Sequence, residues 1–179
     1  MKYLIVCFCI LFAPVTRAQD TGYTSFDTGA ELLGYPAGII TGFHIAYNFR
    51  VHHSILAGIA HNKANRKDFG EHDDERGGGW GGHIGYRYYF RYKPYGFFVG
   101  ERNDVWGLTI HWKQGTATGT STITVLQPTL ELGYTFLIHD QLFITPVLAN
   151  GAEFNLKTRG EKVGQGFITL LGLSAGYRF

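Results

Sequence analysis

The last sixteen residues, 164–179, alternate between two kinds of side chain so regularly that they constrain the fold more than any other segment. Successive side chains of a β-strand point to opposite faces of the sheet. One face of such a strand would be mostly apolar and would end in two aromatic rings: Phe167, Thr169, Leu171, Leu173, Ala175, Tyr177 and Phe179. The opposite face would carry glycines, Ser174 and Arg178. The segment therefore predicts a strand with one apolar face.

The same alternation predicts seven further strands upstream of this one. They are expected over residues 22–33, 38–49, 54–61, 80–92, 95–113, 122–136 and 142–155. In the clearest of them, 80–92, a helix would scatter arginine and tyrosine around its circumference, whereas a strand separates them onto two faces. The chain is therefore predicted to be all-β.

The apolar residues of the predicted strand 95–113 switch from odd-numbered to even-numbered positions between Val99 and Trp106. A β-bulge near residues 102–104 would explain the change within one long strand, and two separate strands would explain it equally well. We favour the bulged strand. Pro128 cannot donate a hydrogen bond within its strand and also predicts a bulge.

The predicted connections alternate between short and long. The short ones lie near residues 50–53, 93–94 and 137–141, and the longer ones near 34–37, 62–79, 114–121 and 155–163. Barrels of the bacterial outer membrane have an even number of strands, short periplasmic turns and longer external loops. The spacing therefore predicts an eight-stranded antiparallel up-and-down barrel with its short turns in the periplasm.

The beginning of the chain has the features of a secretory signal peptide. A basic start at Met1-Lys2 precedes an apolar run over residues 4–15 and a small-residue cleavage site at residues 16–18. The run is too short to span a bilayer as a helix. We expect a signal peptide over residues 1–18 and a barrel domain over 19–179, with a buried N-terminal strand as the alternative. Both cysteines, Cys7 and Cys9, fall inside the signal peptide, so the mature chain would lack disulfides.

The apolar face could point outward into lipid or inward, as in a soluble lipocalin-like barrel. Two features favour lipid. Aromatic rings gather beside the short turns, as in the girdle of a membrane barrel: Tyr47, Phe49, Tyr88, Phe90, Tyr92, Tyr95, Tyr134, Phe136, Tyr177 and Phe179. The opposite faces carry glycine and polar groups that suit a wet or ion-paired interior, such as His44 and Asn48. A net charge of +2 does not indicate nucleic-acid binding.

The chain ends on aromatic-x-aromatic, Tyr177-Arg178-Phe179, and residues 85–90 are followed by a short turn and Gly96-Phe-Phe-Val-Gly100. In these features it resembles the small eight-stranded outer-membrane β-barrels of the OmpA/OmpX-like group, including those common in Bacteroidota. The family pattern places a glycine five residues before the end, where this chain has Ser174. The resemblance implies a location in the bacterial outer membrane and specifies no activity.

An ion-paired cluster is predicted inside the barrel. The interior of an eight-stranded barrel is just wide enough for side chains to fill, and buried charges must be paired. The predicted lumen cluster consists of His83, Arg87, Arg91, His111, Lys113 and Glu131, and Glu153 is a further candidate partner. Such a cluster would plug the barrel, and the alternative is a narrow porin-like channel for small solutes.

The predicted external loop over residues 62–79 runs from basic (Lys63, Arg66, Lys67) to acidic (residues 71–75). Dense carboxylates can hold Ca²⁺, but the spacing matches no EF-hand and charge runs are usually solvated. We predict no metal site and no cofactor. The basic half would suit lipopolysaccharide phosphates or a surface partner.

A lipid A-modifying enzyme is the third hypothesis. The residue types of a catalytic triad are present in Ser121, His111 and either Asp104 or Glu101. A triad is defined by the geometry of its side chains, which the sequence does not give. We predict that the protein is no enzyme. It is expected to be a monomeric outer-membrane barrel with a structural or surface-interaction role, contacting outer-membrane lipid, lipopolysaccharide and an extracellular ligand or surface partner.

Overall fold

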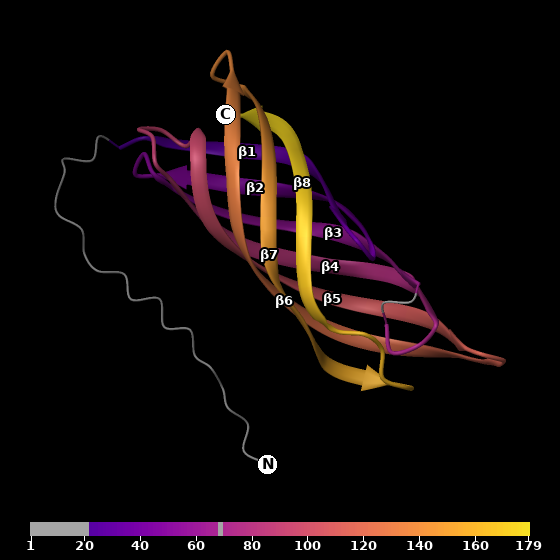
Figure 1. Cartoon of the computed structure of the whole chain (residues 1–179). Coiled ribbons are helices and arrows are strands. Elements are labelled where there is room, and N and C mark those ends of the chain that lie inside the picture. Colours follow the sequence, from indigo (N-terminus) through magenta and orange to yellow (C-terminus); the bar gives the residue numbers. More distant parts are fainter. Residues whose placement is uncertain (1–21, 68–69) are drawn as a thin grey trace.

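The computed structural model describes residues 22–67 and 70–179, and these form a closed barrel of eight antiparallel strands (Figure 1). Each strand pairs with its neighbours in the sequence, and β1 closes the ring against β8. The strands are β1 (Thr24–Tyr35), β2 (Gly38–Phe49), β3 (His53–Lys67), β4 (Asp74–Tyr89), β5 (Gly96–Gln114), β6 (Ala117–Ile138), β7 (Leu142–Arg159) and β8 (Gly166–Arg178). The predicted fold class is confirmed. The predicted signal peptide lies outside the described residues, which include no helix long and apolar enough to span a membrane.

The strands extend well into the segments predicted as long loops. β5 and β6 continue to a turn at Gly115-Thr116, β3 and β4 leave only residues 68–73 between them, and β7 runs on to Arg159. Threonine is β-branched and suits a strand, so the Thr-rich segment 117–124 is paired with β5 and does not form a loop. We call this end, with connections 36–37, 68–73, 115–116 and 160–165, the hairpin end. In Figure 1 the β5–β6 hairpin projects from it.

The opposite end, which we call the turn end, carries connections 50–52, 90–95 and 139–141 together with the C-terminus (Figure 1). Two of these connections contain consecutive residues with positive φ: Arg50 (48°) and Val51 (50°), and His139 (52°) and Asp140 (57°). Such pairs match the twist of the strands that they join. The tight turn predicted at His139-Asp140 is therefore confirmed.

The outer surface of the barrel is an apolar belt. Phe43, Leu130 and Leu171, on three different strands, are 69%, 70% and 67% exposed. Soluble monomers rarely expose apolar patches larger than a few hundred Å². A belt that surrounds a closed barrel fits the hydrocarbon core of a bilayer, and the lipocalin-like alternative, with this face turned inward, is wrong.

Aromatic rings adjoin one another around the turn end. Centroid distances are 5.0 Å for Phe26–Tyr47, 5.7 Å for Tyr47–Phe49, 4.8 Å for Phe97–Tyr134 and 4.9 Å for Tyr177–Phe179. These spacings are favourable for aromatic pairs, and the amphipathic rings suit the membrane–water interface. The predicted girdle is thus present at the end of the barrel where it was expected.

The bulge predicted near residues 102–104 is wrong. β5 pairs with β4 and β6 in unbroken register, and its even-numbered residues face inward from Phe98 to Ile110. The apolar residues change face because the interior itself becomes apolar, so Trp106 is fully buried inside the barrel. Pro128 also keeps its register, opposite Asn103, and the irregularity of β6 and β7 lies instead at Thr124/Val125.

Tightly packed side chains fill the half of the lumen nearer the hairpin end. We call this group the apolar layer, and all its members are at most 5% exposed: Leu33, Ile40, Trp106, Leu108, Ile110, Ile123, Val125, Ile168 and Leu170. Burying a large aliphatic side chain contributes about 1.5–3 kcal/mol, so this layer is a conventional hydrophobic core inside the barrel.

Candidate functional site

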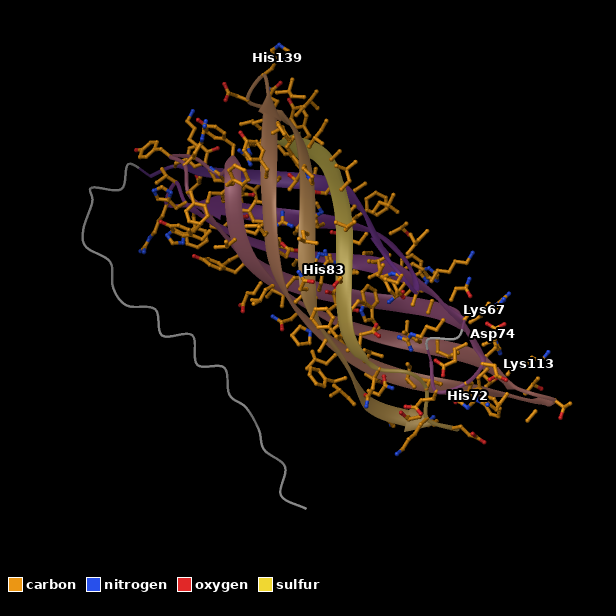
Figure 2. All side chains as sticks on the ribbon, in the orientation of Figure 1. Lys67, His72, Asp74, His83, Lys113 and His139 are labelled. Atoms are coloured by element: carbon orange, nitrogen blue, oxygen red, sulfur yellow. The ribbon has the colours of Figure 1, made fainter. Side chains whose placement is uncertain are left out.

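A network of charges centred on Arg102 occupies the middle of the lumen. The Arg102 guanidinium donates to both carboxylate oxygens of Glu31 at 2.8 Å and to Asp104 at 2.9–3.1 Å. Its Nη2 also lies 3.0 Å from Nδ1 of His83, which Figure 2 shows in the middle of the barrel. All four side chains are buried. Bidentate guanidinium–carboxylate bonds of this kind are among the strongest in proteins.

A second ion pair lies beside this network. Arg87 Nε donates to Glu131 Oε2 at 2.9 Å, and its guanidinium lies 4.6 Å from the centroid of the Phe98 ring. His44 Nδ1 is 3.7 Å from Glu31 Oε2. We call Glu31, His44, His83, Arg87, Arg102, Asp104 and Glu131 the central ion network. Because each buried charge has a partner of opposite sign, the network is tolerated inside the barrel.

A third ion pair lies where β1 meets β8, toward the turn end. Arg178 donates to both oxygens of Asp27 at 2.7 Å and to the carbonyl of Pro94 at 2.9 Å. All of these contacts are buried. The pair therefore joins the first and last strands to the turn 90–95 beneath the central ion network.

The structure brings three of the six predicted lumen residues into the lumen: His83, Arg87 and Glu131. Arg91 instead lies exposed in the turn 90–95, 5.6 Å from the Tyr95 ring centroid. His111 and Lys113 lie exposed on the outer face of β5 near the hairpin end, where Figure 2 labels Lys113. Their placement in the lumen was wrong because the predicted bulge in β5 does not exist, so odd-numbered residues of this strand face outward.

Sequence reasoning missed the centre of the network. Arg102 and Asp104 were assigned to the bulge, and Glu31 was given no role in the predicted strand 22–33. The sequence did contain a sign of the network, because Asp27 and Glu31 lie on the same face of the predicted strand 22–33 as Leu33. Two inward carboxylates on one strand require cations opposite them.

Loop and strand residues form a second cluster of charges at the hairpin end. Arg66 Nη2 donates to Glu153 Oε2 at 2.6 Å, its Nη1 donates to the Gly164 carbonyl at 2.5 Å, and Nη1 lies 3.7 Å from Glu75 Oε2. His72 Nδ1 lies 3.0 Å from Glu75, and its Nε2 lies 3.5 Å from Glu161. We call the five charged or titratable residues of this group the rim cluster: Arg66, His72, Glu75, Glu153 and Glu161.

At the hairpin end, residues 70–75 pack against residues 163–164 across the end of the barrel. Gly164 N donates to Glu75 at 3.1 Å, Val163 is only 2% exposed, and the His72 ring stacks on Trp112 at 4.4 Å. A Cβ at Gly164 would lie 3.0 Å from Gly70 Cα, so glycine permits the close approach of the two loops. The rim cluster therefore covers the apolar layer.

His72 lies within the charge run 71–75, which was expected to be solvated, but it is only 9% exposed. Its burial disfavours the charged ring, yet the hydrogen bonds and charges of Glu75 and Glu161 outweigh this and raise the pKa of His72. The protonated ring is thus the form that the loops stabilise.

The catalytic residues suggested by the sequence do not assemble. Ser121 is buried and donates its hydroxyl to the Glu161 carbonyl at 2.7 Å, whereas His111 Nδ1 lies 2.9 Å from Thr120 Oγ1 on the outer face. Asp104 is committed to Arg102 inside the lumen. Within residues 22–67 and 70–179, no group of three His, Cys, Asp or Glu side chains is placed to hold a metal ion.

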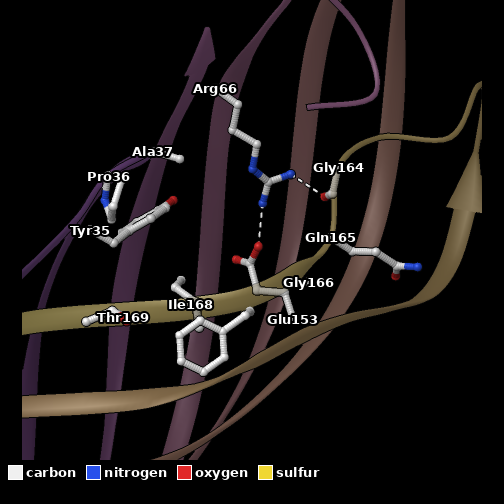
Figure 3. A pocket seen from close by; sticks show the side chains of 11 residues that line it. Tyr35, Pro36, Ala37, Arg66, Glu153, Gly164, Gln165, Gly166, Ile168 and Thr169 are labelled. Atoms are coloured by element: carbon white, nitrogen blue, oxygen red, sulfur yellow. Dashed lines mark hydrogen bonds and ion pairs between the residues drawn. The ribbon is translucent and has the colours of Figure 1, made fainter. Parts of the chain in front are cut away.

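A cavity of about 280 Å³ opens beside the rim cluster (Figure 3). Its lining comes from the β1–β2 turn, from β3 and β7, and from the chain entering β8: Tyr35, Pro36, Ala37, Arg66, Glu153 and 164–169. This cavity was not foreseen from the sequence.

Among solved structures, the chain is similar to the N-terminal β-barrel domain of Pseudomonas aeruginosa OprF. The TM-score is 0.54 and the identity 17%, covering 88% of this chain and 99% of that chain. Neisserial surface protein A (NspA; TM-score 0.44, 12% identity) and Ail of Yersinia pestis (0.47, 11%) each match over 88% of this chain and 97% of theirs. No protein-family profile and no curated protein sequence matches this chain.

The OprF barrel and the apolar belt together confirm the predicted architecture. The chain folds as a small outer-membrane β-barrel. At 17% identity the likeness concerns the fold alone, so the Bacteroidota resemblance stays a prediction.

Proposed function

We propose that the protein is a closed, non-conducting barrel of the outer membrane that serves a structural or surface-interaction role through its hairpin end. The observation that carries this proposal is the filling of the lumen. The central ion network, the apolar layer and the rim cluster follow one another along the barrel, and their side chains are buried except for Glu161 at the rim. A water-filled path would have to pass all three, and the buried aliphatic side chains of the apolar layer offer water no hydrogen-bond partner.

The hairpin end is the external end in this proposal. Outer-membrane barrels have short periplasmic turns and place both termini on that side, and here the tight turns and Phe179 lie together. The β5–β6 hairpin (Figure 1) would then project from the cell surface. It is the most accessible element for a surface partner.

The basic residues outside the barrel support contact with lipopolysaccharide. Lys63, His111 and Lys113 are exposed on β3 and β5, beyond the outward-facing Trp80. Trp80 suits a membrane interface, so cations beyond it would lie at the level of the lipid headgroups. Lysine is a common phosphate ligand, which makes the phosphates of the outer leaflet the natural counterions.

Planar-bilayer recording tests the closed barrel. We expect no discrete conductance steps from the wild-type protein, with an open porin as the positive control. Regular steps would refute the proposal and favour the narrow channel.

Lipopolysaccharide binding is tested separately. The double variant Lys63→Gln/Lys113→Gln should bind lipopolysaccharide vesicles more weakly, while Lys93→Gln, in the turn 90–95, should bind as wild type does. Equal binding by all three proteins would exclude the headgroup contact.

A further inference from the structure

The cavity beside the rim cluster has a buried acceptor that no described residue satisfies. Glu153 is 7% exposed, and its Oε2 accepts from Arg66 at 2.6 Å. Its Oε1 accepts no hydrogen bond from the described residues. In Figure 3 this oxygen points away from Arg66, toward the side of the cavity where Tyr35 lies. A buried carboxylate oxygen without a donor is costly, so it indicates a missing partner.

Tyr35 presents a second acceptor. Its hydroxyl donates to Asn62 Oδ1 at 2.7 Å, so its one proton is already used. Toward any other group the hydroxyl oxygen offers only lone pairs. The polar groups that Glu153 and Tyr35 present to the cavity are therefore both acceptors, and an occupant must bring donors.

The charges around the cavity favour a cationic donor. The single guanidinium of Arg66 faces two buried carboxylates, Glu153 at 2.6 Å and Glu75 at 3.7 Å. His72 contacts Glu75 but also contacts Glu161, a further carboxylate. Negative charge thus exceeds positive charge in the rim cluster, and buried charges are stable only when paired.

The shape of the cavity limits the size of the occupant and gives it an entrance. Pro36, Gln165 and Gly166 are exposed at the mouth, whereas Ile168 is 5% exposed at the floor. A volume of about 280 Å³ lies just below the range of drug-sized sites. Tyr35, Ala37 and Ile168 would contact a short apolar chain.

We propose that this cavity binds a small molecule carrying a primary ammonium group, with the ammonium on Glu153 Oε1 and Tyr35 Oη and the alkyl portion against Ile168. An ammonium has three donors and no acceptor, which matches the two acceptors and the excess of negative charge. The site lies at the rim and does not depend on whether the lumen conducts.

Ligand titrations of the folded protein in detergent test the proposal, using n-butylammonium as the probe and n-butanol and methyl glucoside as neutral comparisons. The dissociation constant for n-butylammonium should be lower than that for n-butanol by about tenfold or more, because hydrogen bonds to charged groups are worth about twice neutral ones. Equal binding of n-butylammonium and either neutral compound, or no binding of n-butylammonium, would overturn the proposal.

Three variants locate the site. Glu153→Gln should weaken n-butylammonium binding about tenfold, and Ala37→Phe should block the cavity without changing its charge. Asp140→Asn, an equal change of charge in the exposed turn 139–141 at the turn end and outside the cavity lining, should leave binding within about twofold. Heat-dependent gel mobility reports whether each variant folds, and if Glu153→Gln does not fold, Ala37→Phe alone decides. Unchanged binding by the folded Glu153→Gln or Ala37→Phe protein would refute the assignment.

Discussion

The two halves of the lumen are filled by opposite chemistry although the same strands form both. Toward the turn end, β5 contributes Arg102 and Asp104 to the central ion network. Two to six residues after Asp104, the same strand contributes Trp106, Leu108 and Ile110 to the apolar layer. In the first region the residues are held by directional bonds between charges, and in the second by packing, with one hydrogen bond from Trp106 Nε1 to Gln127 Oε1 at 3.1 Å. The comparison teaches that alternation of polarity marks the inward face only where the interior is polar.

The largest expected effect comes from removing the centre of the ion network. Arg102→Met should lower the free energy of unfolding by about 3–5 kcal/mol, because Glu31 and Asp104 would remain as buried, unpaired charges. Guanidinium-induced unfolding in phospholipid vesicles measures the change. Arg91→Met, at an exposed arginine, is the matched control and should unfold as wild type does. A loss below about 1 kcal/mol would mean that the network is solvated, as surface pairs are.

A cavity in the apolar layer should have a somewhat smaller effect. Leu108 is 1% exposed, and Leu108→Ala should cost about 3 kcal/mol through lost burial and the cavity left behind. The same unfolding assay applies. Leu171→Ala, on the lipid-facing surface, leaves no internal cavity and should cost clearly less. Equal losses at the two positions would contradict a packed layer at Leu108.

Replacing a whole ion pair sharpens the comparison, because it converts one kind of region into the other. Arg87→Met alone should destabilise by about 3 kcal/mol, whereas Arg87→Met with Glu131→Leu should lie within about 1 kcal/mol of wild type. The single variant leaves the buried Glu131 carboxylate without its partner, whereas the double variant removes both charges. A double variant as unstable as the single one would show that the pair itself is required.

The smallest expected effect concerns pH at the rim cluster. The folded protein raises the pKa of His72 above its usual 6.5. The stabilisation that the protonated ring gives to the folded protein is therefore complete below pH 6.5 and is lost as the pH rises through the folded-state pKa. Between about pH 5.5 and 8.5 the free energy of unfolding should fall by less than about 1 kcal/mol on this account. His72→Gln should flatten the profile. If His72→Gln left the profile unchanged, protonation of His72 would not contribute to the free energy of unfolding.

Much of the barrel could be predicted from the sequence because lipid outside and polar groups inside impose a period of two. Residues 80–92 show the rule at its clearest, with Ile84 outward and His83 and Arg87 inward as expected. The same rule failed at β5, where Val105 faces lipid and Trp106 faces the apolar layer. Both side chains are apolar, so the pattern alone cannot assign the face.

The partners of the charges were harder to predict than their positions. Glu153 was suggested as a lumen acid, but its partner Arg66 was assigned to an external loop. The two residues are 87 positions apart in the chain, and only the stagger of β3 and β7 around the barrel brings them together. The cavity beside them follows from the same juxtaposition.

By itself the sequence determined that the chain alternates, that it does so eight times, and that its aromatic rings gather beside the tight turns. These are local properties, because neighbouring residues on a strand must point to opposite faces. Closure of the ring decided the rest: which charges meet in the lumen, where the interior turns from ionic to apolar, and how two loops fold over Glu75. Contacts across a barrel depend on the register and stagger between strands that are distant in the chain, so these contacts cannot be predicted from any single segment of the sequence.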